Sequence, residues 1–148
     1  LDLCHHLIGH LPVKLISATS VNIDKKKPDE DSASIIVSYS DGSIANIFYS
    51  SDGAESLSKE RIEIYGGGKT VIIDDFISAE FYNMHKSTKK AIRKIDKGQR
   101  NQIHFYLENL ISKGKSLIDF NNIVQTTELS LDATECARTG QSKIYEFI

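Results

Sequence analysis

The stretch Lys59–Phe81, KERIEIYGGGKTVIIDDFISAEF, decides the fold that this sequence predicts. It contains two runs rich in isoleucine and valine, Arg61–Tyr65 and Thr70–Asp74, joined by a GGGK turn at positions 66–69. A third run, Phe76–Tyr82, follows almost at once. Apolar and polar residues alternate with a period of two, which is typical of strands, and glycine permits the positive φ of a tight hairpin turn. The stretch therefore predicts an antiparallel sheet.

A second hairpin is predicted ahead of that stretch. An Asp-Gly pair at 41–42 lies between two strand-like runs, Ser34–Ser40 and Ser43–Ser50. Asp-Gly favours a two-residue type I′ turn, and pairing across such a turn sets Val37 opposite Asn46. Both faces of this hairpin carry apolar residues, so we expect helices to cover one face and a partner surface to cover the other.

The C-terminal part of the sequence predicts two helices. The first, Gln99–Lys113, ends at Gly114, and the second, Phe120–Thr139, has Asp119 as N-cap and Gly140 as its stop. Apolar residues follow the helical i, i+3, i+4 pattern in the first of these helices at Ile103, Tyr106, Leu107, Leu110 and Ile111.

Shorter elements complete the predicted fold. A helix at the N-terminus ends near Gly9, and further strands are expected over Val13–Asn22, within Asn83–Ile95 and over Lys143–Phe147. The segment Ile23–Ser32 has three lysines followed by three acidic residues, which predicts a solvated loop rather than a basic patch. This order predicts an α+β fold: an open, largely antiparallel β-sheet with helices packed on one face.

Composition narrows the functional classes. The 148 residues, 40% of them hydrophobic, fit one domain with a core. The 18 basic and 20 acidic residues argue against a nucleic-acid or membrane-surface partner, and no apolar run has the length of a membrane span. Cys4 and Cys136 favour reduced thiols in the cytoplasm, although a disulfide stays open. The chain opens at Leu1 in a helical pattern without a cap, which predicts a piece of a longer polypeptide.

Motifs for independent chemistry are weak. His6 and His10 have the i, i+4 spacing of zinc ligands, but no third ligand is evident, so surface or interface histidines are the favoured interpretation. The Gly-Lys-Thr sequence at 68–70 lacks the first glycine of a phosphate loop and leads into a strand. Asp74 and Asp75 are adjacent, so on a strand they point to opposite faces. No GxGxxG motif is present, and we expect no cofactor or metal site in this chain.

Several segments nevertheless share one resemblance. ERIEIYGGGKTVIIDDF (Glu60–Phe76), SYSDGSIANIFYSS (Ser38–Ser51), DKG (Asp96–Gly98) and ATECARTGQ (Ala133–Gln141) occur in this sequence. Together they resemble the C-terminal domain of the Gfo/Idh/MocA oxidoreductases, which are NAD(P)-dependent sugar and inositol dehydrogenases. The similarity is greatest to the branch of bacterial surface-polysaccharide biosynthesis, some of whose members are bi-domain proteins fused to a zinc-type alcohol dehydrogenase module.

The resemblance implies that the catalytic residues lie outside this chain. The best register places Leu1-Asp2 on the family's Ile-Asp, so the family's catalytic histidine precedes Leu1. The lysine and the glycine fingerprint of the nucleotide-binding half are absent as well. His5 and His6 are the alternative candidates for the catalytic histidine, but the register disfavours them.

The same resemblance suggests substrate-binding residues. Asp2 matches the aspartate of the family's HxxD motif, and Lys97 lies in a DKGH-like motif whose histidine is replaced here by Gln99. The other candidates flank the loop after the second hairpin. For each candidate an ordinary surface or strand-end role is an equal alternative. The candidates are Asp2, Tyr49, Ser50, Lys59 and Lys97.

We therefore expect a substrate-binding and dimer-forming domain of a cytoplasmic sugar or nucleotide-sugar dehydrogenase. The full-length protein would use NAD or NADP, and this fragment would be inactive alone, forming a homo-oligomer through its sheet face. One alternative is a free-standing interaction module that uses its sheet only to associate. A further alternative is a metal protein built on His6 and His10.

Overall fold

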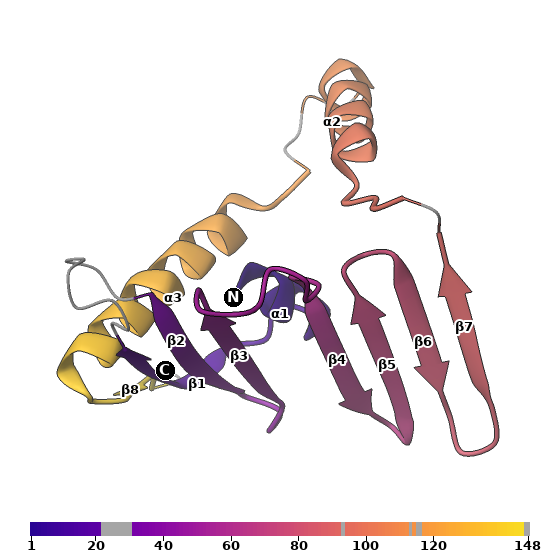
Figure 1. The fold of residues 1–148 in the computed structure, drawn as a ribbon. Helices are drawn as coiled ribbons and strands as arrows, with labels where there is room; N and C mark the ends of the chain where they lie inside the picture. The colour runs from indigo at the N-terminus through magenta and orange to yellow at the C-terminus, as the bar shows by residue number, and fades with distance from the viewer. Residues whose placement is uncertain (22–30, 93, 113, 115–116, 147–148) are drawn as a thin grey trace. The chain divides into compact units, whose positions relative to one another are not determined.

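The computed structural model describes residues 1–21, 31–92, 94–112, 114 and 117–146, and its open antiparallel sheets and helices confirm the α+β class (Figure 1). Most of the predicted loop Ile23–Ser32 and the last residue of the predicted strand Val13–Asn22 lie outside the described residues. None of the described helices is long and apolar enough to cross a membrane. The elements are α1 (Asp2–Leu7), β1 (Val13–Val21), β2 (Ser32–Tyr39), β3 (Ile44–Ser50), β4 (Arg61–Gly66), β5 (Lys69–Asp74), β6 (Ser78–Tyr82), β7 (Ser87–Ala91), α2 (Gln99–Ser112), α3 (Phe120–Thr139) and β8 (Lys143–Ile144).

The chain divides into two compact units. The first comprises Leu1–Gly53 and Ile118–Ile148, and the second comprises Ala54–Leu117. Each unit holds one sheet of four strands: the order is β3-β2-β1-β8 in the first and β4-β5-β6-β7 in the second. All the strand pairs are antiparallel.

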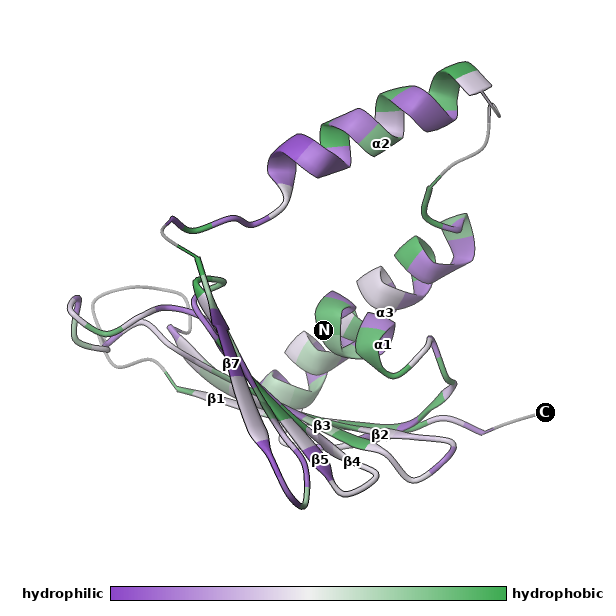
Figure 2. Cartoon of the chain, turned by 90° about the vertical axis from the view of Figure 1, so that its right-hand side faces the viewer, coloured by the Kyte–Doolittle hydropathy of each residue, from purple (hydrophilic) through white to green (hydrophobic). Residues whose placement is uncertain are grey.

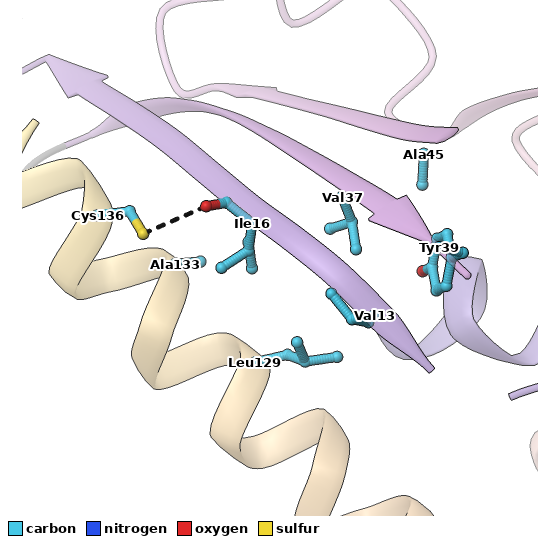
Figure 3. Close-up of a cluster of buried hydrophobic side chains, with 8 residues drawn as sticks. All are labelled: Val13, Ile16, Val37, Tyr39, Ala45, Leu129, Ala133 and Cys136. Atoms are coloured by element: carbon cyan, nitrogen blue, oxygen red, sulfur yellow. Dashed lines mark hydrogen bonds between the residues drawn. The ribbon is translucent and has the colours of Figure 1, made fainter. Parts of the chain in front are cut away.

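The core of the first unit lies between its sheet and α3 (Figure 3). The strand register sets Ile16, Val37 and Ala45 side by side on three neighbouring strands, and all three are buried. Residues at helical spacing on α3 cover this row: Leu129, Ala133 and Cys136. Burial of a valine or isoleucine side chain stabilises the fold by about 1.5–3 kcal/mol, so this contact is a main source of stability for the unit.

The bounds of α3 agree with the prediction because both of its ends carry capping residues. The Asp119 carboxylate accepts a hydrogen bond from the N–H of Asn121 at 2.8 Å. At the other end Gly140 adopts a left-handed conformation, with φ 71°, and donates its N–H to the carbonyl of Cys136 at 2.8 Å. An acceptor side chain at the N-cap and a left-handed glycine after the last turn are the usual start and stop of a helix.

The hairpin between β2 and β3 differs from the predicted type I′ turn. Gly42 has φ 90°, but Asp41 does not belong to the residues with positive φ, so only one of the two central positions is left-handed. The N–H of Tyr39 donates to the carbonyl of Ser43 at 2.9 Å, which leaves a loop of three residues. The Asp41 carboxylate accepts the N–H of Ser43 at 2.8 Å and stabilises this longer loop.

The longer loop shifts the register of the hairpin by one residue. Val37 therefore pairs with Ala45 and not with Asn46. Because side chains alternate between the faces of a strand, this shift exchanges the two faces of β3 and brings Ala45 into the core.

The second unit follows the sequence prediction more closely. The glycine-rich turn consists of Gly67 and Gly68, with φ 55° and 72°, between β4 and β5. Strand β7 lies within the predicted segment Asn83–Ile95. Helix α2 starts at the predicted residue and has alternating apolar and polar bands in Figure 2, but none of its described residues is buried.

A polar contact fixes the C-terminal segment of the first unit to α3. Asp132 is 9% exposed, and its carboxylate accepts hydrogen bonds from Lys143 Nζ at 2.6 Å and from the Tyr145 hydroxyl at 2.5 Å. Burial alone would raise the pKa of Asp132, but the two hydrogen bonds and the charge of Lys143 outweigh it and lower the pKa. The short strand β8, which the sequence predicted to extend to residue 147, pairs with β1 beside this contact. Phe147 lies outside the described residues.

The first prediction concerns the N-cap of α3. Replacement of Asp119 by alanine removes the acceptor for the N–H of Asn121 and should lower the free energy of unfolding by about 1 kcal/mol. The Asp119→Asn variant keeps an acceptor oxygen and serves as the control. Its free energy of unfolding should fall by only about a few tenths of a kcal/mol. Urea denaturation followed by circular dichroism measures both values, and equal losses in the two variants would contradict the assigned role of the cap.

The second prediction concerns pH. A carboxyl group with a lowered folded pKa stabilises the fold above its unfolded pKa, and this stabilisation is lost as the pH falls through the folded pKa. The free energy of unfolding should therefore decrease as the pH drops below about 4, and Asp132→Asn should weaken this dependence. Urea denaturation at a series of pH values measures it. Glu135→Gln, at an exposed position of the same helix, is the control; if it flattens the curve as much as Asp132→Asn does, the assignment fails.

Candidate functional site

The predicted substrate-binding residues are divided between the two units. Asp2, Tyr49 and Ser50 belong to the first unit, whereas Lys59 and Lys97 belong to the second. All five side chains are exposed. The predicted residues thus form two local groups, one in each unit.

Tyr49 and Ser50 are successive residues at the end of β3 and therefore project from opposite faces of the sheet. Tyr49 pairs with Ala33, which lies on the face that α3 covers, yet the tyrosine is still 62% exposed. The Ser50 hydroxyl accepts hydrogen bonds from Ser32 Oγ and from the N–H of Asp52, both at 3.3 Å. Tyr49 is thus available to a ligand, while Ser50 is engaged at the strand end.

A pocket lies on the α3-covered face of the sheet, close to two of the predicted residues. Its volume is about 260 Å³. Leu1, which precedes Asp2, and Ala33, which pairs with Tyr49, both line it. The full lining is Leu1, Ala18, Ser20, Ala33, Ile35, Ser130, Ala133, Thr134 and Ala137.

The pocket walls consist of apolar groups and hydroxyls, without a charged side chain. Ser130 Oγ and Thr134 Oγ1 donate to helix carbonyls four residues earlier, at 2.8 and 3.0 Å. Their oxygens therefore remain available as acceptors. Such a lining suits uncharged ligand groups that combine C–H surface with hydroxyl donors.

In the second unit, Lys97 is held in place by two partners. Its ammonium lies 3.3 Å from Glu60 Oε1 and 5.6 Å from the centre of the Phe76 ring. Phe76 and Asp75 have φ 54° and 45°, which is uncommon for residues with a side chain, and the N–H of Asp75 donates to the carbonyl of Glu60 at 2.7 Å. Lys59 directly precedes Glu60 in the sequence, and Lys97 contacts the Glu60 side chain. Both predicted lysines are therefore next to the residue whose carbonyl binds this turn.

Two predictions about this turn were wrong: the placement of Asp75 on a strand and the start of the third strand. Strand β5 ends at Asp74, so Asp75 lies in the turn instead of on the opposite face of a strand. Asp74 accepts a hydrogen bond from Ser58 Oγ at 2.7 Å. The third predicted run begins at Ser78 rather than at Phe76, because Phe76 is the second left-handed residue of the turn.

His5, which the sequence suggested only as a disfavoured alternative for the catalytic histidine, occupies the core of the first unit. His5 is fully buried, and its Nε2 lies 3.0 Å from Gln125 Oε1 on α3. Its ring stacks on Tyr39 at 6.0 Å and meets His10 edge-on at 4.9 Å. Burial, with a smaller effect from Cys4, raises the pKa of Tyr39 to about 12, so this hydroxyl stays protonated at neutral pH.

The spacing of the first helix contained a signal for this burial. Apolar residues surround His5 at helical intervals, namely Leu1, Cys4 and Ile8, all of which pack against the core. His6 is exposed, although its ring lies 5.7 Å from that of His10. No cluster of three metal-ligating side chains occurs among the described residues.

One face of the second sheet carries two tyrosine–glutamate pairs that sequence reasoning also missed. On β4, Tyr65 donates to Glu63 Oε2 at 2.5 Å, and Arg61 contacts the other oxygen at 2.7 Å. The hydrogen bond from Tyr65, followed by that from Arg61, lowers the pKa of Glu63.

The second pair repeats this arrangement on β6. Glu80 accepts from Lys89 Nζ at 2.5 Å and from the Tyr82 hydroxyl, and these two contacts lower its pKa. Both glutamates flank Ile72 in the ladder, so they share one face. This face presents ionised carboxylates that are already engaged by tyrosine and by cations. The only signal in the sequence is the repeated spacing of tyrosine two residues after glutamate.

Comparisons with known proteins place this fold. No family model and no curated protein matches the chain by sequence. An oxidoreductase from Agrobacterium radiobacter in complex with NAD+, L-tartaric acid and magnesium matches with a TM-score of 0.77 and 18% identity, over 97% of this chain and 46% of the other. An aldose-aldose oxidoreductase from Caulobacter crescentus complexed with glycerol matches with a TM-score of 0.75 and 17% identity, over 97% and 44%.

An inositol dehydrogenase homologue from Azotobacter vinelandii, complexed with NADH and myo-inositol, matches with a TM-score of 0.70 and 13% identity, over 97% of this chain and 47% of the other. This chain thus spans less than half the length of these proteins, and at such identities the likeness concerns the fold. The fold of this chain is thus shared with a part, 44–47% by length, of each of these three oxidoreductases.

Proposed function

We propose that this chain is the substrate-binding and oligomerisation domain of an NAD(P)-dependent sugar or nucleotide-sugar dehydrogenase of the Gfo/Idh/MocA family. The fold carries the proposal, because 97% of the chain matches less than half of an aldose-aldose oxidoreductase and of an inositol dehydrogenase homologue. The ordered sequence motifs over Ser38–Ser51, Glu60–Phe76 and Asp96–Gly98 support the same family and its polysaccharide-biosynthesis branch.

The proposal assigns the cofactor to a preceding domain. Both sheets of the described chain are antiparallel, and the sequence has no GxGxxG turn between a strand and a helix, which is the usual cradle for a dinucleotide. Residues 1–148 then form one substrate domain that is catalytically incomplete alone and acts in the cytoplasm. The bound NAD or NADP would exchange a hydride with a carbon of the sugar, while a lysine and a histidine upstream of Leu1 handle the hydroxyl proton.

The role of this chain is to hold the sugar in position. Asp2 supplies a carboxylate acceptor, and the Tyr49 ring supplies an apolar surface with a hydroxyl at its end. The pocket beside them accepts hydrogen bonds through Ser130 and Thr134. Ser50 in the first unit, and Lys59 and Lys97 in the second, remain predicted contacts, and the Lys97 ammonium lies 3.3 Å from Glu60 Oε1.

The open face of the first sheet supports association between copies. It is the face opposite α3, and three of its apolar side chains are largely exposed: Ile44 at 69%, Phe48 at 76% and Ile144 at 72%. Ile44 and Phe48 lie on β3 and Ile144 lies on β8, the two edges of this sheet. Exposed apolar side chains on a sheet face favour association, and the same face of two copies can pair about a twofold axis. This face also favours the alternative, a free-standing interaction module.

The reading frame upstream of Leu1 distinguishes the two functions. A nucleotide-binding half with a GxGxxG turn and a histidine shortly before Leu1 supports the dehydrogenase. A start codon close to Leu1 would remove the dehydrogenase proposal and leave the interaction module.

The third prediction tests the sugar contact directly. Saturation-transfer NMR of this chain with myo-inositol and with a panel of aldoses should give signals that Tyr49→Ala reduces several-fold. Tyr65→Ala is the matched control, because Tyr65 is similarly exposed, at 68%, but lies on the other sheet. Equal signals in both variants would exclude Tyr49 as a substrate contact.

The fourth prediction concerns self-association. Phe48→Asp places a charge on the open face of the first sheet and should yield a monomer of about 16.5 kDa by light scattering, whereas the unaltered chain forms a larger species. Leu57→Asp is the control, since Leu57 is 71% exposed but lies outside the sheet. A monomeric unaltered chain at all concentrations would contradict the assigned interface.

A further inference from the structure

The outer edge of β7 has the features of a docking edge for another strand. β7 is the last strand in the order β4-β5-β6-β7, and no described strand pairs with its outer side. All five of its residues, Ser87–Ala91, are exposed. An edge of this kind presents a row of backbone donors and acceptors to a partner strand.

The hydrogen-bond pattern identifies which backbone groups point outward. Ile92 donates its N–H to the carbonyl of Ile77 at 2.8 Å, and Asn83 donates to the carbonyl of Lys86 at 2.9 Å. Bonded and non-bonded pairs alternate along an antiparallel ladder, so the groups of Thr88 and Lys90 face β6. Those of the alternate residues therefore face away from the sheet: Ser87, Lys89 and Ala91.

The charge of this edge selects the kind of strand that it accepts. Between Asn83 and Ile92 the chain has three lysines and no acidic residue. Lys89 and Lys90 project from opposite faces; the Lys89 ammonium is paired with Glu80 on β6 at 2.5 Å, so the charge offered to an added strand comes from Lys86 and Lys90. Lysines on an edge oppose pairing with a second copy of the same edge, because like charges would then face each other. They favour pairing with an acidic strand, because opposite charges would then face each other.

We propose that the outer edge of β7 binds an extended, acidic peptide segment of another protein as an additional strand. The backbone groups of Ser87, Lys89 and Ala91 supply the hydrogen bonds, and Lys86 and Lys90 supply the charge preference. This edge contains none of the predicted sugar contacts and belongs to the second unit.

The opposite edge of the same sheet provides an internal control. The hydrogen bond from Asp75 to the carbonyl of Glu60 fixes the bonding pattern of β4, so that Arg61, Glu63 and Tyr65 direct their backbone outward. Arg61 and Glu63 form an ion pair there, at 2.7 Å. This edge offers the same backbone geometry without an excess of positive charge.

The test uses the 148-residue chain and a fluorescein-labelled peptide of alternating glutamate and valine, with binding followed by fluorescence anisotropy. A peptide of equal charge with a central proline is the comparison probe, because proline removes a backbone donor and resists strand pairing. Lys89→Ala removes the ammonium group and its ion pair with Glu80, whereas Lys89→Pro removes these and the outward N–H as well. Glu63→Pro makes the corresponding backbone change on β4.

The expected result is weak, salt-sensitive binding of the alternating peptide and none of its proline-containing counterpart. Lys89→Pro should bind about tenfold more weakly than Lys89→Ala, since backbone hydrogen bonds to the edge are lost, and Glu63→Pro should bind like the unaltered chain. Equal binding of the two peptides, or equal affinity of the two Lys89 variants, would show simple charge attraction and overturn the proposal. Circular dichroism confirms that each variant is folded, and a Lys89→Pro variant that is unfolded is replaced by Ser87→Pro. Peptide-independent dimerisation that Lys89→Pro abolishes would instead assign the edge to a second copy and equally overturn it.

Discussion

The packing of α3 against the first sheet is the contact on which the first unit depends. Leu129, Ala133 and Cys136 close over the row formed by Ile16, Val37 and Ala45, and most of the buried apolar side chains among the described residues belong to this layer. The thiol of Cys136 also donates to the backbone carbonyl of Ile16 at 3.6 Å. His5, the pocket and the contact of Asp132 with the C-terminal segment are all arranged around the same helix. A substitution that prevents α3 from packing on the sheet would therefore disrupt the His5 contact, the pocket and the Asp132 contact together.

Much of the fold could be predicted from the sequence where local signals and tertiary packing agree. The caps Asp119 and Gly140 define α3 to the residue, and the glycines at 67 and 68 define the turn between β4 and β5. The hairpin of β2 and β3 was predicted with the wrong register, because the side chain of Asp41 binds Ser43 and favours a three-residue loop. The residue types at positions 40–43 do not by themselves distinguish a two-residue turn from a three-residue loop. The resulting register shift of one residue exchanges the two faces of β3.

The candidate site was less accessible to sequence reasoning. The predicted residues are divided between the two units, and the pocket of the first unit is lined by residues of α3, β1 and β2 that are distant in the sequence. His5 was considered only as a disfavoured catalytic alternative, and its burial was not predicted, although its neighbours in the helix follow the core pattern. Lys97 contacts Glu60 and also lies over the ring of Phe76, which with Asp75 has a left-handed conformation that residues with a side chain rarely adopt. The candidate residues thus lie beside backbone conformations that their sequence does not favour, whereas the helix ends and the glycine turn follow the usual preferences of their residues.

The division of the first unit into two sequence segments affects the order in which the protein is built. The chain leaves this unit at Gly53 and returns to it only at Ile118. During synthesis, β1, β2 and β3 therefore emerge from the ribosome before the helix that shields them. Until the later segment appears, the side chains of Ile16 and Val37 face water or a chaperone, and contacts across such a separation form slowly. A ribosome that stalls within the second unit would hold a nascent sheet with its apolar side uncovered, a natural target for chaperone capture.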